Sequence, residues 1–439
     1  MSRLVVSPPG HPVALPGPIR VPGDKSIAHR AFLLAARATA PSTIAGVPAG
    51  LDVAATRGCI EALGAGIDSD GRARVVVEPA PVPDAGAPEH HLDCANSGTT
   101  MRLLCGILAG RPGAAVLDGD ASLRHRPMRR VTAPLGEMGA HIATTDGHAP
   151  LRVTGAELGG IDYACPVPSA QVKGAILLAG LDATTPTRVT LPGPSRDHTE
   201  RMLAALGVGV SVEDGGRSVG VAPAALPGFD AVVPGDVSSA AFVAGLAAVT
   251  GGAVRIEGVG LNPTRTRFLE VLARMGCAVE TEVATEALGE PIGAIEVTGP
   301  ATAGFVLEGD AVADCIDEIP LLCAVAACVE AESVVRDAAE LRVKESDRLA
   351  TTAAGLRALG AGVEESSDAL AIVGRAGPRR HPRPVNVDAA GDHRIALALA
   401  VAGCALGPVA IDGWQAAAVS YAEFAEVLAA AGALVDREP

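Results

Sequence analysis

One pattern recurs six times along the chain and constrains its architecture more than any other feature. In each copy an apolar, helix-like segment ends in a glycine, and Val or Ile follows three positions later. The glycines are spaced 75, 68, 69, 84 and 72 residues apart, and they are Gly64, Gly139, Gly207, Gly276, Gly360 and Gly432. This recurrence indicates a supersecondary unit repeated six times, which accounts for all 439 residues.

The chemistry around these glycines predicts the content of one unit. A helix that ends abruptly often places its next residue in the left-handed region, where glycine carries no steric penalty. Asp-Gly turns between apolar strands follow in three copies, at Asp70-Gly71, Asp146-Gly147 and Asp214-Gly215. The unit therefore reads as helix, strand, turn and strand, with a connecting strand before the next helix.

One such unit cannot bury its own apolar face, so we expect three units to close around a common core. Two groups of three predict an α/β fold with two similar domains. The alternative is chance recurrence of short Leu-Gly-Ala strings in a chain rich in Ala and Gly. The agreement between spacing and turn chemistry favours the repeat.

Composition narrows the class of function. Apolar residues make up 49 % of the chain, which excludes global disorder, and the formal charge is −15 with only 2 % aromatic residues. A general nucleic-acid binder would need a basic face, so an anionic substrate must instead be held by a local basic cluster. Nine scattered cysteines without a C-x-x-C pair favour reduced thiols over a disulfide framework or a zinc site. We expect a cytoplasmic protein with no membrane, nucleic-acid or metal partner.

Basic and small polar residues cluster where repeat helices are predicted to start. PGDKSIAHRA places Lys25 and Ser26 at such a start with Arg30 one turn later, and NSGTTMR places Gly98 at another. A helix N-terminus offers free N–H groups and a positive dipole end, so these residues suit a phosphate or carboxylate. Ordinary helix capping is the alternative for each string taken alone.

Further strings of the same kind follow along the chain. LRHRPMRR holds four arginines, SAQVK and SRDHTE again stand at predicted helix starts, and DHRIALALA places Arg394 at one more. CIDEIPLL sets Asp317 and Glu318 against an apolar helix, where burial can raise the pKa of a carboxylate and suit it to proton transfer. Helix starts that face one cleft would converge on one polyanionic set of ligands.

The strings PGDKSIAHRA, NSGTTMR, LRHRPM, SAQVK, SRDHTE, IDEIP, ELRVKESDRL and DHRIALALA, in this order, resemble the 3-phosphoshikimate 1-carboxyvinyltransferase (5-enolpyruvylshikimate-3-phosphate synthase) family. The resemblance runs from about Val21 to Phe424. It implies the enolpyruvyl transferase fold, an inside-out α/β barrel of two domains with three βαβαββ-type repeats each. The domains would be 22–234, and 1–21 plus 235–439, with two crossovers and the active site in the cleft between them.

The resemblance also implies an activity. Members of this shikimate-pathway family transfer the enolpyruvyl group of phosphoenolpyruvate to the 5-hydroxyl of shikimate 3-phosphate and release phosphate through a tetrahedral intermediate. The reaction serves chorismate and aromatic amino acid biosynthesis and needs no cofactor. The enzymes of this family are the target of glyphosate. We expect a monomer whose partners are these two small molecules.

Residue roles carry over position by position as implications of the resemblance. Catalytic roles fall to Asp317 as base on the 5-hydroxyl, and to Glu345, with Lys25 as the alternative, as proton donor to C3. The residues implied to bind shikimate 3-phosphate are Lys25, Ser26, Arg30, Ser169, Ala170, Gln171, Arg196, Asp317 and Lys344. The residues implied to bind phosphoenolpyruvate are Lys25, Gly98, Arg126, Gln171, Arg348 and Arg394.

Some positions depart from the family pattern, among them Ala28, Ala121, the turn Ala49-Gly50-Leu51-Asp52 and Ala422. They leave open a paralogue that acts on another cyclitol. A transferase acting on a sugar nucleotide would typically show Lys-Asn where this chain has Lys25-Ser26, and a loop cysteine that is missing here. A non-catalytic protein that binds phosphorylated metabolites is disfavoured, because Asp317, Glu345 and Arg394 are all present.

Overall fold

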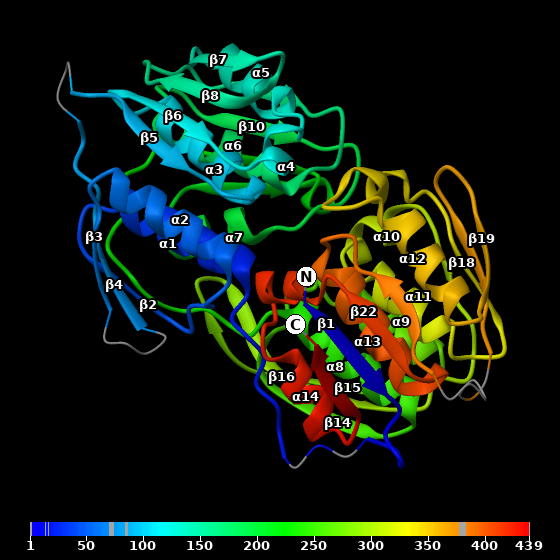
Figure 1. The fold of residues 1–439 in the computed structure, drawn as a ribbon. Coiled ribbons are helices and arrows are strands. Elements are labelled where there is room, and N and C mark those ends of the chain that lie inside the picture. Colours follow the sequence, from blue (N-terminus) through cyan, green and yellow to red (C-terminus); the bar gives the residue numbers. More distant parts are fainter. Residues whose placement is uncertain are drawn as a thin grey trace. The chain divides into compact units, whose positions relative to one another are not determined.

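The computed structural model of the chain contains small sheets, each covered by helices (Figure 1). It describes residues 2–13, 15, 17–69, 74–83, 87–375, 377 and 383–438. Within these residues there are six sheets, five of four strands and one of three. The predicted α/β fold class with repeated units is confirmed.

The chain divides into two compact units. Unit 1 contains Met1–Pro22, Gly235–Thr285 and Pro291–Pro439, and unit 2 contains Gly23–Pro234 and Glu286–Glu290. The domains expected from the sequence placed Pro22 with 23–234 and did not assign the short segment Glu286–Glu290 to that domain. This segment is the turn of a hairpin that starts and ends in unit 1.

Unit 2 holds the first three sheets. Its elements are α1 (Lys25–Arg37), β2 (Ser42–Ala45), α2 (Leu51–Ala62), β3 (Gly66–Ser69), β4 (Arg74–Glu78), β5 (His90–Asp93), α3 (Gly98–Ala109), β6 (Ala114–Asp118), α4 (Ala121–Arg124), α5 (Arg129–Glu137), β7 (His141–Thr145), β8 (His148–Thr154), β9 (Asp162–Ala164), α6 (Ala170–Gly180), β10 (Thr187–Thr190), α7 (His198–Ala205), β11 (Val210–Glu213), β12 (Ser218–Val221) and β13 (Asp230–Val232).

Unit 1 holds the other three sheets. Its elements are β1 (Arg3–Ser7), α8 (Val237–Thr250), β14 (Ala253–Gly260), α9 (Arg267–Arg274), β15 (Ala278–Ala287), β16 (Glu290–Thr298), β17 (Val306–Leu307), α10 (Asp310–Cys315), α11 (Ile319–Ala326), β18 (Glu332–Val335), α12 (Arg348–Ala358), β19 (Gly362–Glu365), β20 (Leu370–Val373), β21 (Val385–Asp388), α13 (His393–Leu406), β22 (Val409–Asp412), α14 (Phe424–Ala430) and β23 (Leu434–Glu438).

The repeat is clearest in the sheet β5-β6-β8-β7. Strand β5 pairs parallel to β6 across α3, and β8 pairs antiparallel to both β6 and β7. Along the chain this is a βαβαββ unit with one extra short helix, α4, before α5. The register aligns Leu92, Leu117 and Leu151 in one row across three strands, and all three are buried. Each sheet thus turns an apolar face toward the helices.

Two repeats borrow a strand from a distant part of the chain. In unit 2, β13 pairs parallel to β2 and supplies the first strand of the first repeat. In unit 1, β1 lies between β22 and β23 and pairs antiparallel to both. In each unit, therefore, one sheet is completed by a strand that lies far from its partner strands in the sequence.

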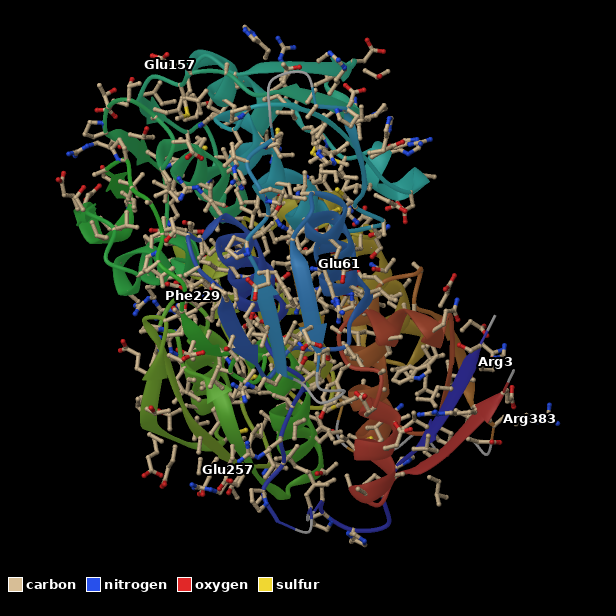
Figure 2. All side chains as sticks on the ribbon, turned by 90° about the vertical axis from the view of Figure 1, so that its left-hand side faces the viewer. Arg3, Glu61, Glu157, Phe229, Glu257 and Arg383 are labelled. Atoms are coloured by element: carbon tan, nitrogen blue, oxygen red, sulfur yellow. The ribbon has the colours of Figure 1, made fainter. Side chains whose placement is uncertain are left out.

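Two kinds of helix cover the sheets. Helices α3, α6, α8, α11 and α13 are buried over nearly their whole length and form the centre of each unit, whereas α9 has one apolar stripe that packs inward. The central helices pack closely, because a Cβ on Gly106 of α3 would lie 2.2 Å from the carbonyl oxygen of Ala175 in α6. Charged side chains such as Glu61 and Glu157 lie at the surface (Figure 2).

The glycines that defined the repeat take the predicted conformation. All six have positive φ, between +83° and +109°, and each stands two positions after the last residue of a helix. The Asp146-Gly147 turn joins β7 to β8 with φ of 52° and 81°, which matches a tight hairpin turn. The turn predicted at Asp70-Gly71 lies outside the described residues. None of the helices in the described ranges is long and apolar enough to cross a membrane.

Candidate active site

The first turn of α1 in unit 2 carries two of the predicted residues. The Asp24 carboxylate caps this helix by accepting from the backbone N–H groups of Ser26 (2.7 Å) and Ile27 (3.1 Å). The cap holds Lys25 at the first helical position, where its Nζ lies 3.2 Å from Oδ2 of Asp52 at the start of α2. An anion near Lys25 would be attracted both by the ammonium group and by the positive end of the helix dipole.

Arg30 follows one turn later and is buried. Its Nε donates to Oγ1 of Thr199 (2.8 Å) and its Nη1 donates to the carbonyl oxygen of Ser26 (2.9 Å). Burial lowers the pKa of Arg30 to about 10, the nearby Glu200 carboxylate opposes this change, and the charge of Arg196 adds to it. Arg30 is still a cation at neutral pH, and the predicted residue Arg196 is close enough to act on its charge.

The helix α3 begins at Gly98. The N-cap residue Ser97 accepts from the backbone N–H of Thr100. A Cβ on Gly98 would lie 2.9 Å from Nη1 of Arg102 and 3.2 Å from Nη1 of Arg126. Bare backbone therefore faces two guanidinium groups at a helix N-terminus, which is an arrangement that suits a small anion.

Gln171 joins this cluster from the first turn of α6, whose N-cap is Ser169 and whose first residue is Ala170. Its Oε1 accepts from Nη1 of Arg102, and its Nε2 donates to Oγ1 of Thr99 (2.9 Å). The structure thus brings the starts of α3 and α6 together through the side chain of one predicted residue.

In unit 1, Asp317 lies just before α11 and contacts two arginines. Its Oδ1 accepts from Nη1 of Arg348 (3.1 Å) and lies 3.4 Å from Nε of Arg394. The backbone carbonyl of Asp317 accepts from Nη1 of Arg394 (3.0 Å). Two guanidinium groups therefore stabilise the negative charge of this carboxylate. The apolar helix beside Asp317 in the sequence did not indicate these two partners.

Arg348 links the carboxylates of this cluster. Its side chain is 1 % exposed; Nη2 donates to Glu345 Oε2 (2.6 Å) and Nε donates to Asp392 Oδ2 (2.8 Å). Burial alone would lower the pKa of Arg348, but attraction to Glu345, Asp392 and Asp317 raises it above its usual value. The guanidinium is permanently charged and holds the two predicted catalytic carboxylates in one place.

Lys344 stands beside the same cluster. Burial lowers its pKa, and the charge of Asp317 is the largest influence in the opposite direction. Its Nζ is 3.8 Å from Oε1 of Glu340. Lys344 is therefore within electrostatic reach of the predicted base while its ammonium group is only loosely paired.

Sequence reasoning missed three charged residues of these clusters: Asp52, Arg102 and Asp392. Asp52 pairs with Lys25, Arg102 contacts Gln171, and the fully buried Asp392 accepts from Arg348 while capping the backbone N–H of Arg394. Arg102 and Asp392 stood inside motifs that had been singled out. Asp52 carried no local signal, since its partner lies 27 residues away.

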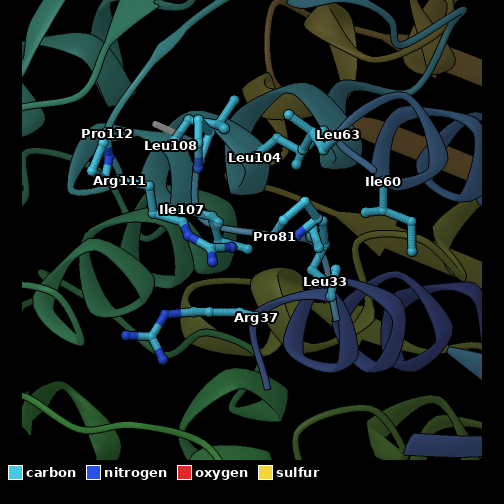
Figure 3. Close-up of a pocket in the computed structure, with 13 residues that line it drawn as sticks. Leu33, Arg37, Ile60, Leu63, Pro81, Leu104, Ile107, Leu108, Arg111 and Pro112 are labelled. Atoms are coloured by element: carbon cyan, nitrogen blue, oxygen red, sulfur yellow. The ribbon is translucent and has the colours of Figure 1, made fainter. Parts of the chain in front are cut away.

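A small cavity in unit 2 lies apart from these residues (Figure 3). Its walls come from α1, α2 and α3 and are mostly apolar, with Leu33, Ile60, Leu104, Arg37 and Arg111 among the lining residues. Its volume of about 30 Å³ leaves room for about two water molecules, so it does not suit a substrate. None of the predicted site residues lines it.

Comparisons with known proteins agree with the resemblance read from the motifs. A family model described as EPSP synthase (3-phosphoshikimate 1-carboxyvinyltransferase) matches residues 10–428. A 3-phosphoshikimate 1-carboxyvinyltransferase of Synechococcus sp. (strain RCC307) is 47 % identical over 429 residues, covering 95 % of this chain and 97 % of the relative. One from Acidithiobacillus ferrooxidans (strain ATCC 53993 / BNL-5-31) is 44 % identical over 440 residues and covers 99 % of each chain.

Solved structures give the same result. The EPSP synthase of Acinetobacter baumannii superimposes with a TM-score of 0.87 at 38 % sequence identity, covering 100 % of both chains. A second structure of an EPSP synthase from that organism gives a TM-score of 0.85 at 38 % identity, covering 99 % of each chain. Sequence model, relatives and fold agree over essentially the whole length, and the chain belongs to the EPSP synthase (3-phosphoshikimate 1-carboxyvinyltransferase) family.

Proposed function

We propose that this chain transfers the enolpyruvyl group of phosphoenolpyruvate to the 5-hydroxyl of shikimate 3-phosphate, and that residues of both clusters bind these two substrates. The observation that carries the assignment of residues is the buried Arg348, which contacts both Asp317 and Glu345. An addition–elimination reaction on two anionic substrates requires cations to bind them and carboxyl groups to move protons.

The unit 2 cluster supplies the anion-binding part. Lys25, Ser26 and Arg30 on α1, with Arg196, bind the phosphate of shikimate 3-phosphate, and Ser169, Ala170 and Gln171 at the start of α6 orient its ring. Gly98, Arg126 and Gln171 bind phosphoenolpyruvate together with Lys25. The start of α3 has no side chain at Gly98, and the nearby guanidinium groups provide N–H donors for one small anion.

The unit 1 cluster supplies the proton transfers. The 5-hydroxyl oxygen of shikimate 3-phosphate attacks C2 of phosphoenolpyruvate while the Asp317 carboxylate accepts the hydroxyl proton. In the same step C3 of phosphoenolpyruvate receives a proton from Glu345. A tetrahedral intermediate forms. Glu345, which is a carboxylate after giving up its proton, then takes a proton from C3 while the C2–O bond to phosphate breaks, and this gives the enol ether and inorganic phosphate. Lys344, Arg348 and Arg394 neutralise the charges of the substrates during these steps.

The contact between Glu345 and Arg348 bears on how Glu345 comes to carry the proton that it donates. In the structure its carboxylate accepts from Arg348, an arrangement that favours the ionised form. An incoming phosphoenolpyruvate competes for the same guanidinium group, weakens this contact and lets Glu345 take up the proton that it later donates. Substrate binding and activation of the acid are thereby coupled.

The direct test is phosphate release from phosphoenolpyruvate with shikimate 3-phosphate, with UDP-N-acetylglucosamine, and with no acceptor. Turnover only with shikimate 3-phosphate is expected. Turnover with the sugar nucleotide, or none with either acceptor by folded protein that still binds phosphoenolpyruvate, would overturn the proposal and favour a paralogue with another role.

We also propose that the protein acts as a monomer in the cytoplasm. One chain carries every residue of the proposed site, so no second copy is needed to complete it. All nine cysteines are free thiols, and eight of them are buried, as is usual for proteins kept in a reducing compartment. Sedimentation at micromolar concentration and fractionation of the source cells test these two points.

A further inference from the structure

Two contacts, one helical turn apart, join α1 to α2. Lys25 pairs with Asp52, and four residues further along both helices Nδ1 of His29 lies 2.6 Å from Oγ1 of Thr56. The outer pair is partly open to solvent, with side chains 22 % and 19 % exposed. The inner pair is completely buried. A ligand can therefore reach the outer contact but not the inner one.

The inner contact continues to the start of α3. Oγ1 of Thr56 lies 2.6 Å from Oγ1 of Thr100, which donates to Oγ of the N-cap residue Ser97 (2.7 Å). His29, Thr56, Thr100 and Ser97, here called the hydroxyl chain, thus connect the first two turns of α1, α2 and α3. The residue that follows Ser97 is Gly98.

The direction of donation follows from counting hydrogens. A hydroxyl group has one hydrogen to donate. Thr100 donates its hydrogen to Ser97, so Thr56 donates to Thr100 and His29 donates from Nδ1 to Thr56. The hydroxyl groups of Thr56 and Thr100 then each accept one hydrogen bond and donate another. A substitution that removes the Thr56 hydroxyl therefore breaks two hydrogen bonds.

The environment of His29 supports this order. Burial lowers its pKa to about 4, while Asp52 opposes this change and Lys25 and Arg30 add to it. The ring is neutral at physiological pH and donates from one nitrogen only, without adding a charge beside Lys25. A fixed, uncharged donor is what the end of such a chain requires.

We propose that Thr56 is a positioning residue for phosphoenolpyruvate: through His29 and Thr100 it holds the first turn of α3, and with it Gly98, in register with Lys25 on α1. The inference rests on the proposed binding roles of Gly98 and Lys25. These two residues act on one small anion from different helices, so their relative position decides how well both can contact it. An error of about 1 Å in such a site can change rates about a hundredfold.

The test compares three variants with the wild-type protein in the phosphate-release assay. Thr56→Val keeps the shape of the side chain but removes both hydrogen bonds. It is expected to raise the KM for phosphoenolpyruvate about tenfold, while the KM for shikimate 3-phosphate changes less than about twofold. Thr56→Ser keeps the hydroxyl and is expected to restore nearly wild-type values.

The matched control is Thr187→Val in β10. Thr187 is also buried, its hydroxyl has no hydrogen-bond partner among the described residues, and it lies in unit 2 outside the proposed site. Wild-type kinetics are expected for it. If Thr56→Val does not fold, Thr100→Val is measured instead, because it breaks the hydroxyl chain at its next member. It is expected to give the same selective rise in the KM for phosphoenolpyruvate.

Three results would overturn the proposal. They are wild-type kinetics for folded Thr56→Val or Thr100→Val, an equal rise in the KM for both substrates, or a Thr56→Ser variant that is as impaired as Thr56→Val. Failure of the proposed function is a separate outcome, because the wild-type protein itself would then show no turnover with shikimate 3-phosphate. The two failures are therefore distinguishable in one experiment.

Discussion

Single residues of the proposed site act through contacts that only the folded chain creates. Motif positions such as Lys25, Arg348 and Arg394 could be picked from the sequence because the resemblance supplied them. The pairing of Lys25 with Asp52 and that of Arg348 with Asp392 could not be predicted, since these partners lie 27 and 44 residues apart and a local pattern contains no information about such a contact. Burial of Arg348 likewise became visible only with the fold.

Gly98→Ala tests whether a small anion lies against the start of α3. The new methyl group would stand 2.9 Å from Nη1 of Arg102 and 3.2 Å from Nη1 of Arg126, so the ends of these side chains must shift. We expect weaker binding of phosphoenolpyruvate and of the competing anion glyphosate, each by about tenfold or more. Inhibition constants for glyphosate in both proteins check this, and unchanged constants would remove Gly98 from the site.

Asp317→Asn tests the base. The amide keeps the size of the side chain and can still accept from Arg348, but it cannot take up the hydroxyl proton. We expect kcat to fall by about 10² to 10⁴ while binding of both substrates is largely kept. Steady-state kinetics together with calorimetric titration of shikimate 3-phosphate check the separation, and a kcat within a few-fold of the wild-type value contradicts the role.

At the scale of elements, the sequence was most informative where structure depends on neighbours in the chain. Helix ends at glycine and the Asp146-Gly147 hairpin were predicted because left-handed φ and tight turns are local requirements. The parallel pairing of β13 with β2 was not predicted, because it joins residues almost 190 positions apart. Contacts between helix starts, such as the hydroxyl chain, are of the same long-range kind.

The buried imidazole of His29 makes the stability of the folded protein depend on pH. Its pKa is about 4 in the folded protein against 6.5 in the unfolded chain, so between these values the unfolded chain binds a proton that the folded protein does not. Stability therefore falls as the pH decreases through this window. From pH 7 to pH 5 the contribution of His29 is about 2 kcal/mol.

Urea unfolding of the wild-type protein and of His29→Gln at both pH values measures this contribution. The glutamine can still donate to Thr56 but does not titrate, so the variant is expected to lose less stability than the wild type on acidification. Equal losses in the two proteins would show that His29 is protonated normally in the folded state.

At the scale of the whole molecule, six repeats are distributed over two units. Their number and approximate length were readable from glycine spacing, whereas membership of the hairpin turn Glu286–Glu290 in unit 2 was not. A buried hydrogen bond explains this membership, because Nδ1 of His198 in α7 lies 2.7 Å from Oε1 of Glu290. Nothing in the local sequence of either residue predicts their contact.

Leu4→Ala tests whether the two units are stabilised separately. Leu4 in β1 is fully buried in the core of unit 1. Its truncation should cost about 2 to 5 kcal/mol. Hydrogen exchange resolved along the chain should show lost protection in β22, β23 and α13 and unchanged protection in unit 2. A uniform loss over both units would indicate a single cooperative structure.

The position of β1 has a consequence for how the protein is made. Arg3 pairs with Asp412, 409 residues later, so the sheet that contains β1 cannot form until the ribosome has synthesised β22. Unit 2 is drawn almost entirely from 23–234 and can fold while synthesis continues. During that interval β1 has neither of its partner strands, so its buried residues Leu4 and Val6 remain exposed on the nascent chain, where a chaperone could cover them.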